Sequence, residues 1–165
     1  MAAQFDASEF TASNAKPLPV VLLLDTSGSM YGDKIKSLND AVGKMLGTFT
    51  KEESQANEFL VSIITFGGTA SLAYSPTPAS ELAYTSLNAD GGTPLGAAID
   101  LAKTLIEDRE QTPSRAYRPL VVLVSDGVPT DSWETRLDHF IQERYSKPHV
   151  IEKKKSARAA SNASW

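Results

Sequence analysis

The sequence predicts an open α/β sheet of the doubly wound, Rossmann-like type, mostly parallel and with helices on both faces. Residues 20–24 (VVLLL) and 120–124 (LVVLV) are unbroken apolar runs, which are typical of strands buried on both faces. Segments with apolar residues at helical spacing alternate with the strands, and the predicted order is β-α-β-β-α-β-α. A length of 165 residues fits one domain with a sizeable core.

The first half of the chain predicts a strand, a helix and a hairpin. The strand at residues 20–24 ends at Asp25, and a helix follows whose apolar stripe is Ile35, Leu38, Val42, Met45, Leu46 and Phe49, with Lys34, Lys36, Asn39 and Lys44 outward. A second strand is predicted at residues 59–66. Gly67 and Gly68 join it to a short antiparallel strand at residues 69–74, and both glycines are expected to take positive φ. Pro76 and Pro78 are expected to end that strand, before a short helix around residues 79–83.

The second half predicts two further helices around the strand at residues 120–124. Thr93 is the expected N-cap of the first helix and Pro94 its first residue. The buried stripe of that helix is predicted to be Leu95, Ala98, Ile99, Ala102, Leu105 and Ile106. A last helix is expected from about residue 132 to 145, with Trp133, Leu137, Phe140 and Ile141 inward.

Composition and charge exclude several classes of function. Cysteine is absent, which excludes a disulfide scaffold, a thiolate zinc site and a cysteine nucleophile. Only two histidines occur, which is too few for a His-rich metal site. The net charge of −4 argues against a nucleic-acid partner. No apolar run is long enough for a signal peptide or a membrane span, so we expect no membrane contact and a cytoplasmic location.

The chain divides into a polar lead (residues 1–16), a folded domain (residues 17–146) and a basic tail (residues 147–165) that we expect to be disordered. The tail holds five basic residues and one acid, so its charge of +4 leaves −8 on the first 146 residues. An acidic body of this kind suits a cation-binding domain.

Five oxygen-bearing side chains follow the predicted strands or open a helix. Asp25, Ser27 and Ser29 alternate along one turn, Thr93 starts a helix, and Asp126 follows the strand at residues 120–124. Taken singly, each has a structural explanation as a turn or helix cap. Together, two carboxylates and three hydroxyls suit Mg²⁺ or Mn²⁺, and a partner carboxylate is the natural sixth ligand. The neighbouring Asp90 and Asp131 are interpreted as solvated loop acids.

These segments resemble the von Willebrand factor A domain and its metal-ion-dependent adhesion site. The family pattern is Asp-x-Ser-x-Ser, a distant Thr, and a distant Asp followed by Gly, and the resemblance covers about residues 18–145. It implies metal ligation by Asp25, Ser27, Ser29, Thr93 and Asp126, with Gly28, Gly92 and Gly127 as supporting loop residues. It also implies Mg²⁺ as the cofactor, with Mn²⁺ or Ca²⁺ as alternatives. The segments GGTPLG and SDGVPTD look closest to bacterial cytoplasmic TerY-like proteins of tellurium-resistance and stress operons.

The resemblance implies a protein-interaction module rather than an enzyme, in which an Asp or Glu of a protein partner completes the metal shell. The family usually continues with further strands and a final helix, which residues 147–165 do not supply. Either the domain is truncated or this tail is not native-like sequence. An exposed sheet edge would then invite self-association.

Two alternatives stay open. The chain could serve as an accessory subunit of a Mg²⁺-dependent AAA ATPase or chelatase complex, which would use the same site with a different partner. It could instead be a Mg²⁺-dependent phosphatase with Asp25 as nucleophile. Such enzymes need a second acid two residues later, where this chain has Ser27, and no phosphate-binding loop motif is present.

Overall fold

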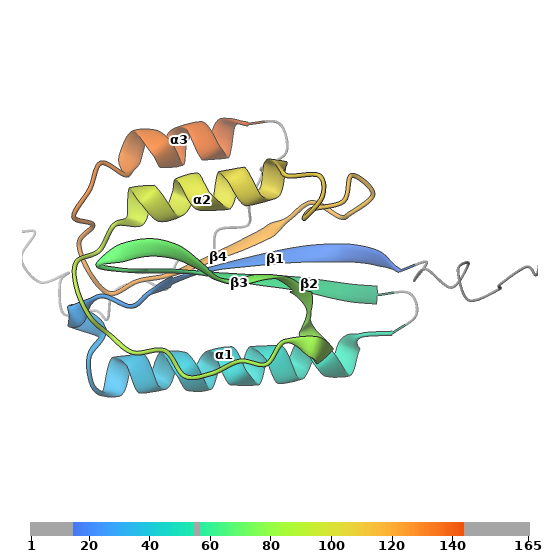
Figure 1. Ribbon diagram of the computed structural model, residues 1–165, viewed down its shortest axis with the longest axis horizontal. Helices are drawn as coiled ribbons and strands as arrows, with labels where there is room; N and C mark the ends of the chain where they lie inside the picture. The colour runs from blue at the N-terminus through green and yellow to red at the C-terminus, as the bar shows by residue number, and fades with distance from the viewer. Residues whose placement is uncertain (1–14, 55–56, 144–165) are drawn as a thin grey trace, which may run out of the picture.

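The computed structural model describes residues 15–54 and 57–143, which form a four-stranded sheet with helices on both faces (Figure 1). The strands are β1 (Lys16–Asp25), β2 (Asn57–Gly67), β3 (Thr69–Pro78) and β4 (Leu120–Val124). The helices are α1 (Asp33–Glu52), α2 (Leu95–Glu107) and α3 (Glu134–Gln142), with single 3-10 turns η2 (Gly28–Met30) and η3 (Ala79–Glu81). The predictions for residues 1–14 and for the tail at 147–165 lie outside the described residues.

The strand order β3-β2-β1-β4 confirms the predicted fold class. β1 runs parallel to both β2 and β4, and β3 pairs antiparallel with β2. The chain leaves β1 toward β2 on one side and later returns to β4 on the other, so the strand order reverses between β1 and β4. Leu24 is paired with Val124, which brings Asp25 and the residues after β4 to the same edge of the sheet. In this fold class, ligands bind at such a switch point.

Alternate residues of β1 pack into two separate cores, because successive side chains of a strand point to opposite faces of the sheet. Val20, Leu22 and Leu24 pack toward α1, whereas Val21 and Leu23 pack toward α2 and Phe140 of α3. Figure 1 shows α1 on one face of the sheet and α2 with α3 on the other. Burial on both faces explains why the run has no polar alternation.

The β2–β3 hairpin forms as predicted, but only one of its two glycines takes positive φ. Gly68 has φ +73°, whereas Gly67 is the last residue of β2. Gly67 is needed for a different reason, because a Cβ there would lie 2.2 Å from the carbonyl oxygen of Thr26. The pair of glycines therefore makes the turn and also lets the loop after β1 approach β2.

The prediction that prolines end β3 after residue 74 was wrong, because β3 continues through Pro78. β3 lies at an edge of the described sheet, so Pro76 and Pro78 need not donate to a strand beyond it. β1 likewise contains Pro17 and Pro19, before Val20 meets Leu120 of β4. Prolines are tolerated where a strand has a neighbour on one side only.

The helix ends also differ from the predicted ones. α2 begins at Leu95 with Pro94 as its N-cap, so Thr93 is not the cap and Pro94 is not the first helical residue. α3 ends at Gln142, and Ile141 is 45% exposed rather than inward. Phe140, the residue before it, is the buried residue of α3.

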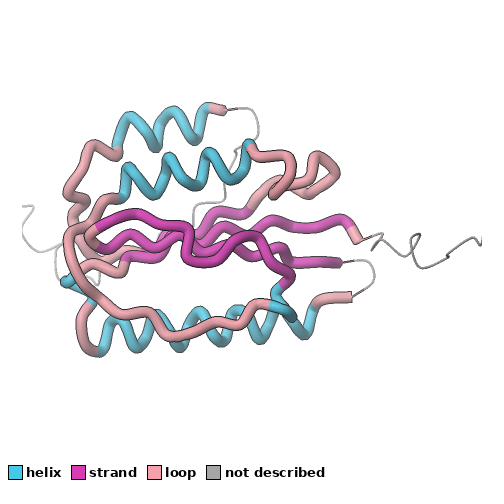
Figure 2. The backbone as a smooth tube through the Cα atoms, in the orientation of Figure 1, coloured by secondary structure: helices cyan, strands magenta, loops and turns pink. Residues whose placement is uncertain are grey.

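One polar side chain of α1 holds the long connection that follows η3. Asn39, predicted to face outward, donates to the carbonyl of Leu87 at 3.0 Å and accepts from the Leu87 amide at 2.8 Å. It also accepts a hydrogen bond from the Tyr84 hydroxyl at 2.6 Å. Figure 2 shows this loop running along α1 toward the start of α2, which delivers residues 90–94 to the carboxyl edge of the sheet.

Candidate metal centre

Three loops meet at the carboxyl edge of β1 and β4, and backbone hydrogen bonds tie them together. The Gly28 amide donates to the Gly91 carbonyl at 2.9 Å, and the Asp90 amide donates to the Thr26 carbonyl at 2.8 Å. The amide of Thr130 donates to the carbonyl of Thr93 at 2.9 Å. Main-chain contacts therefore set the positions of these loops.

Gly91 is required by this close approach, although the sequence analysis did not single it out. It has φ +76°, and a Cβ there would lie 2.5 Å from Cα of Gly68. Its neighbour Gly92 accepts a hydrogen bond from the Gly68 amide at 2.9 Å. Gly28 and Gly92, which were predicted as supporting residues, thus contribute main-chain hydrogen bonds. The close contact with Gly68 is made by Gly91, which was not among them.

Asp25 is fully buried and its carboxylate is held at both oxygens. Oδ1 accepts the Ser27 amide at 2.8 Å, and Oδ2 accepts the Ser125 hydroxyl at 2.6 Å. Ser125 was missed by sequence reasoning, although it directly precedes Asp126 at the end of a buried strand. The orientation of the Asp25 carboxylate is therefore determined from two different loops.

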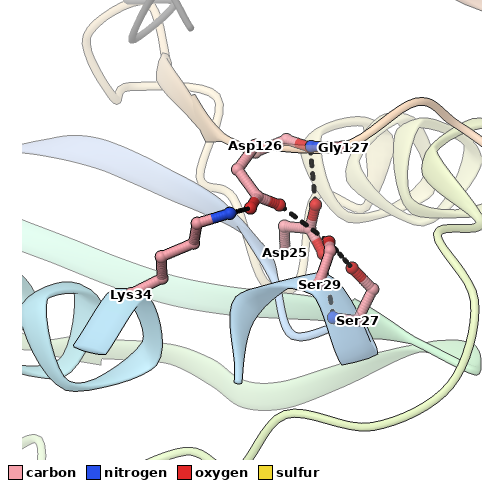
Figure 3. A network of polar contacts seen from close by, with 7 residues as sticks. Asp25, Ser27, Ser29, Lys34, Asp126 and Gly127 are labelled. Carbon is pink, nitrogen blue, oxygen red and sulfur yellow. Dashed lines mark hydrogen bonds and ion pairs between the residues drawn. The ribbon is translucent and has the colours of Figure 1, made fainter. Parts of the chain in front are cut away.

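A chain of polar contacts links four of the five predicted ligands, Asp25, Ser27, Ser29 and Asp126, as Figure 3 shows. The hydroxyls of Ser27 and Ser29 lie 3.0 Å apart, and the Ser29 hydroxyl donates to Oδ1 of Asp126 at 2.8 Å. Asp25 and Asp126, separated by 100 residues in sequence, thus lie in one connected network. The structure brings together the three loops that the sequence analysis assigned to the site.

The clearest sign of convergence is the space above Gly127. A Cβ added there would lie 3.3 Å from Ser29 Oγ, 3.6 Å from Thr93 Oγ1 and 3.7 Å from Asp25 Oδ2. Three oxygens from different parts of the chain therefore lie within 3.7 Å of one point. Hydroxyl and carboxylate oxygens are the ligands that a small hard cation prefers.

Thr93 is buried, at 5% exposure, and is held by its main chain. Its amide donates to Thr130 Oγ1 at 3.1 Å, while its carbonyl accepts the Thr130 amide. The capping role predicted for Thr93 is taken by Asp131, whose two carboxylate oxygens accept the amides of Gly96 and Ala97 at 2.8 and 3.0 Å. Asp131 is therefore a cap supplied from another loop, not a solvated acid.

Lys34, in the first turn of α1, forms an ion pair with Oδ2 of Asp126 (Figure 3). Burial raises the pKa of Asp126, but the hydrogen bonds from Lys34 and Ser29 outweigh it and hold that pKa below its usual value. Sequence reasoning placed Lys34 on the outer face of the helix and missed this contact. A signal was available, because a cation in the first turn opposes the helix dipole and so needs another reason to be there.

The donor set defines what the site could hold. It offers two carboxylates and three hydroxyls, a hard oxygen set that suits Mg²⁺, Mn²⁺ or Ca²⁺ rather than softer metals. Within the described ranges no group of three or more His, Cys, Asp or Glu side chains is placed to hold a metal. A metal centre at this edge therefore depends on its serine and threonine hydroxyls. The residues present fit such an ion.

The helices within residues 15–54 and 57–143 include none that combines the length and the apolar character needed to cross a membrane.

Comparison with known proteins identifies relatives of this fold. The family model described as von Willebrand factor type A domain matches residues 20–128. The chain is 32% identical over 126 residues to inter-alpha-trypsin inhibitor heavy chain H4 of Sus scrofa, and 34% identical over 116 residues to the uncharacterized protein Rv2850c of Mycobacterium tuberculosis. These matches cover 71% and 67% of this chain but 13% and 18% of the relatives, so it spans less than a fifth of their length.

Solved structures agree on the fold. Manganese-loaded TRAP protein of Plasmodium vivax aligns with a TM-score of 0.63 at 22% identity, covering 83% of this chain and 57% of that one. The SpRpn10 VWA domain aligns with a TM-score of 0.59 at 15% identity, covering 86% and 90%. Because the family model matches more than half of the chain, including Asp25 and Asp126, this chain belongs to the von Willebrand factor type A domain family.

Proposed function

We propose that this chain is a divalent-metal-dependent protein-interaction module. Asp25, Ser27, Ser29, Thr93 and Asp126 would hold the ion directly or through water, and an Asp or Glu of a protein partner would complete its shell. The observation that carries the proposal is the convergence of Ser29 Oγ, Thr93 Oγ1 and Asp25 Oδ2 around one point above Gly127.

The proposed ligands contribute different groups to such a site. The buried Asp25 carboxylate is fixed by Ser27 and Ser125, so it offers its charge in one orientation. The hydroxyls add neutral oxygens, which leave a bound divalent ion with net positive character. When bound, the ion supplies a Lewis-acid position for a carboxylate. Mg²⁺ is the proposed ion, with Mn²⁺ or Ca²⁺ as alternatives, and the manganese bound in the TRAP relative supports a metal of this class.

The surroundings of the site also favour contact with a protein. Tyr31 is 82% exposed and Val128 is 73% exposed, and each lies two residues beyond a proposed ligand, Ser29 or Asp126. Exposed apolar side chains beside a charged centre are the composition expected of an interaction surface.

We further propose that the chain binds without catalysing a reaction. Ser27 stands where a phosphatase that used Asp25 as nucleophile would need a general acid. Incubation with p-nitrophenyl phosphate and Mg²⁺ is expected to give no turnover that depends on Asp25. Measurable turnover that Asp25→Asn abolishes would contradict this proposal.

The cellular setting proposed on the motif resemblance is a bacterial cytoplasmic stress or tellurium-resistance complex. An accessory role in a Mg²⁺-dependent ATPase or chelatase complex is the alternative, and it would use the same site. Affinity purification in Mg²⁺ and in EDTA, with the bound proteins identified by mass, separates the two settings.

Calorimetry of Mg²⁺ and Mn²⁺ binding tests the metal site without knowledge of the partner. Even residues that only orient a ligand change metal affinity by about 10- to 100-fold, so Asp126→Ala should lower it by more than about 100-fold. Asp40→Ala, which removes an exposed acid of α1, is the matched control and should leave the affinity unchanged. Equal affinities in the wild type and Asp126→Ala would refute the proposed site.

A further inference from the structure

Lys34 and Asp126 form an ion pair at the edge of the proposed metal site. Lys34 reaches from α1 to Oδ2 of Asp126, while Oδ1 of the same carboxylate accepts the Ser29 hydroxyl at 2.8 Å. Both oxygens of one proposed ligand are therefore engaged by groups of the chain itself. A metal ion that takes Oδ2 must displace the ammonium group (Figure 3).

Charge explains why a lysine is useful at this position. Asp25 and Asp126 lie in one hydrogen-bonded network and repel each other when no cation is present. The Lys34 ammonium neutralises one of these charges, while the three oxygens around the point above Gly127 are not occupied by it. The ion pair is partly open to water, since the Lys34 side chain is 59% exposed and that of Asp126 is 22% exposed. Exposed pairs of this kind are weak and break readily.

We propose that Lys34 is a tethered cation that pairs with Asp126 in the metal-free state and swings away when a divalent ion binds. Lys34 thereby raises the metal concentration at which the site fills. Lys34 acts through Asp126, so it is a positioning residue and not a metal ligand. The inference rests on the proposed metal-binding function.

The test is calorimetry of Mg²⁺ and Mn²⁺ binding to the wild-type chain, Lys34→Met and Lys34→Arg. Loss of the pair and of the repulsion between ammonium and metal should raise the affinity of Lys34→Met for both ions by about 3- to 10-fold. Lys34→Arg keeps the charge and the donor, so it should stay within about 2-fold of the wild type.

Lys36→Met is the matched control. Lys36 is an exposed lysine two residues further along α1, and its removal changes the net charge of the domain by the same amount. If Lys36→Met raises the affinity as much as Lys34→Met, the effect is one of net charge and the inference is overturned.

A second readout compares thermal stability with and without the metal ion. Thermal unfolding in EDTA and in saturating Mg²⁺ should show a larger metal-induced rise in Tm for Lys34→Met than for the wild type. If Lys34 had a merely structural role, Lys34→Met would lower the Tm equally in EDTA and in Mg²⁺, and that result would overturn the inference.

The failure of this inference is distinguishable from failure of the metal site. If the wild type and Lys34→Met bind the metal ions with equal affinity, the proposed metal site is supported and the role of Lys34 as a competitor is refuted. If neither protein binds Mg²⁺ or Mn²⁺, the proposed function is refuted, and so is the inference that rests on it. Binding by Lys34→Met alone would support both.

Discussion

The loops that follow β1 and β4 contribute one aspartate each to the site, but they hold them in different ways. Asp25 is fully buried and accepts hydrogen bonds from the Ser27 amide and the Ser125 hydroxyl. The side chain of Asp126 is 22% exposed, and its partners are the side chains of Ser29 and Lys34. The first aspartate is held inside the fold, whereas the second lies partly open to water in contact with two side chains.

The largest expected effect is on stability at Asp25. Asp25→Ala leaves the Ser27 amide and the Ser125 hydroxyl without their acceptor, which should lower the free energy of unfolding by about 2–4 kcal/mol. Asp126→Ala removes an exposed pair and should cost less than about 1 kcal/mol. Urea denaturation in EDTA measures both. Equal losses would show that the two loops do not differ as described.

A methyl group at Gly127 should separate metal binding from stability. In Gly127→Ala the new Cβ would lie 3.3 to 3.7 Å from three site oxygens, so the methyl group would compete with the proposed ion for the space between them. Mg²⁺ affinity should fall by more than about 10-fold, because a displaced ligand changes affinity by that order. The metal-free free energy of unfolding should change by less than about 1 kcal/mol.

Gly47→Ala is the matched control, since a Cβ at Gly47 meets nothing within 4 Å. It lies inside α1, so it should raise the free energy of unfolding by up to about 1 kcal/mol and leave Mg²⁺ affinity unchanged. Normal Mg²⁺ binding by Gly127→Ala in calorimetry would place the ion elsewhere.

Asp131 extends the comparison, because it lies in the same loop as Asp126 but accepts main-chain amides of α2. It caps α2 by accepting the amides of Gly96 and Ala97. Asp131→Ala should lower the free energy of unfolding by about 1–2 kcal/mol, the usual cost of losing a helix cap. Asp138→Ala, an exposed acid on α3, should change it by less than about 0.5 kcal/mol. Similar values in chemical denaturation would argue against the cap.

The smallest expected effect concerns the loop that leads to Thr93. Burial, and then the neighbouring Tyr74, raise the pKa of Tyr84 from 10.0 to about 12. A raised pKa in the fold means that the contribution of Tyr84 to stability is complete below pH 10 and is lost as pH rises through about 12. An ultraviolet titration of phenolate should show one tyrosine ionising near pH 12, and Tyr84→Phe should lack it. The same curve in both proteins would mean that the loop does not shield Tyr84.

The sequence predicted the parts of the fold that depend on local periodicity. The apolar runs at 20–24 and 120–124 and the stripe of α1 all lie in the predicted elements, because burial on two faces or on one stripe leaves a direct pattern. The ends of elements were harder to predict. Whether Pro76 and Pro78 end β3 depends on its being an edge strand, which no local pattern reveals.

The site was predicted in the same uneven way. Four of the five proposed ligands became candidates because they follow strands that end at one edge of the sheet, and Thr93 became one because it precedes a helix. Their supports were missed, since Ser125 acts on Asp25 from the loop after the neighbouring strand and Lys34 acts on Asp126 from a helix. Asp131 was misinterpreted for the same reason, because it caps a helix that begins 36 residues earlier in the chain.

Paramagnetic broadening by Mn²⁺ tests the central claim most directly. Substoichiometric Mn²⁺ added to the ¹⁵N-labelled chain should erase the amide signals of Ser29, Thr93 and Gly127 first. Those of Lys16 and Asn57, at the opposite edge of the sheet, should persist. An excess of Mg²⁺ should restore the lost signals. Broadening centred on another acidic surface, or affecting only one of the three loops, would contradict a single cation held between β1 and β4.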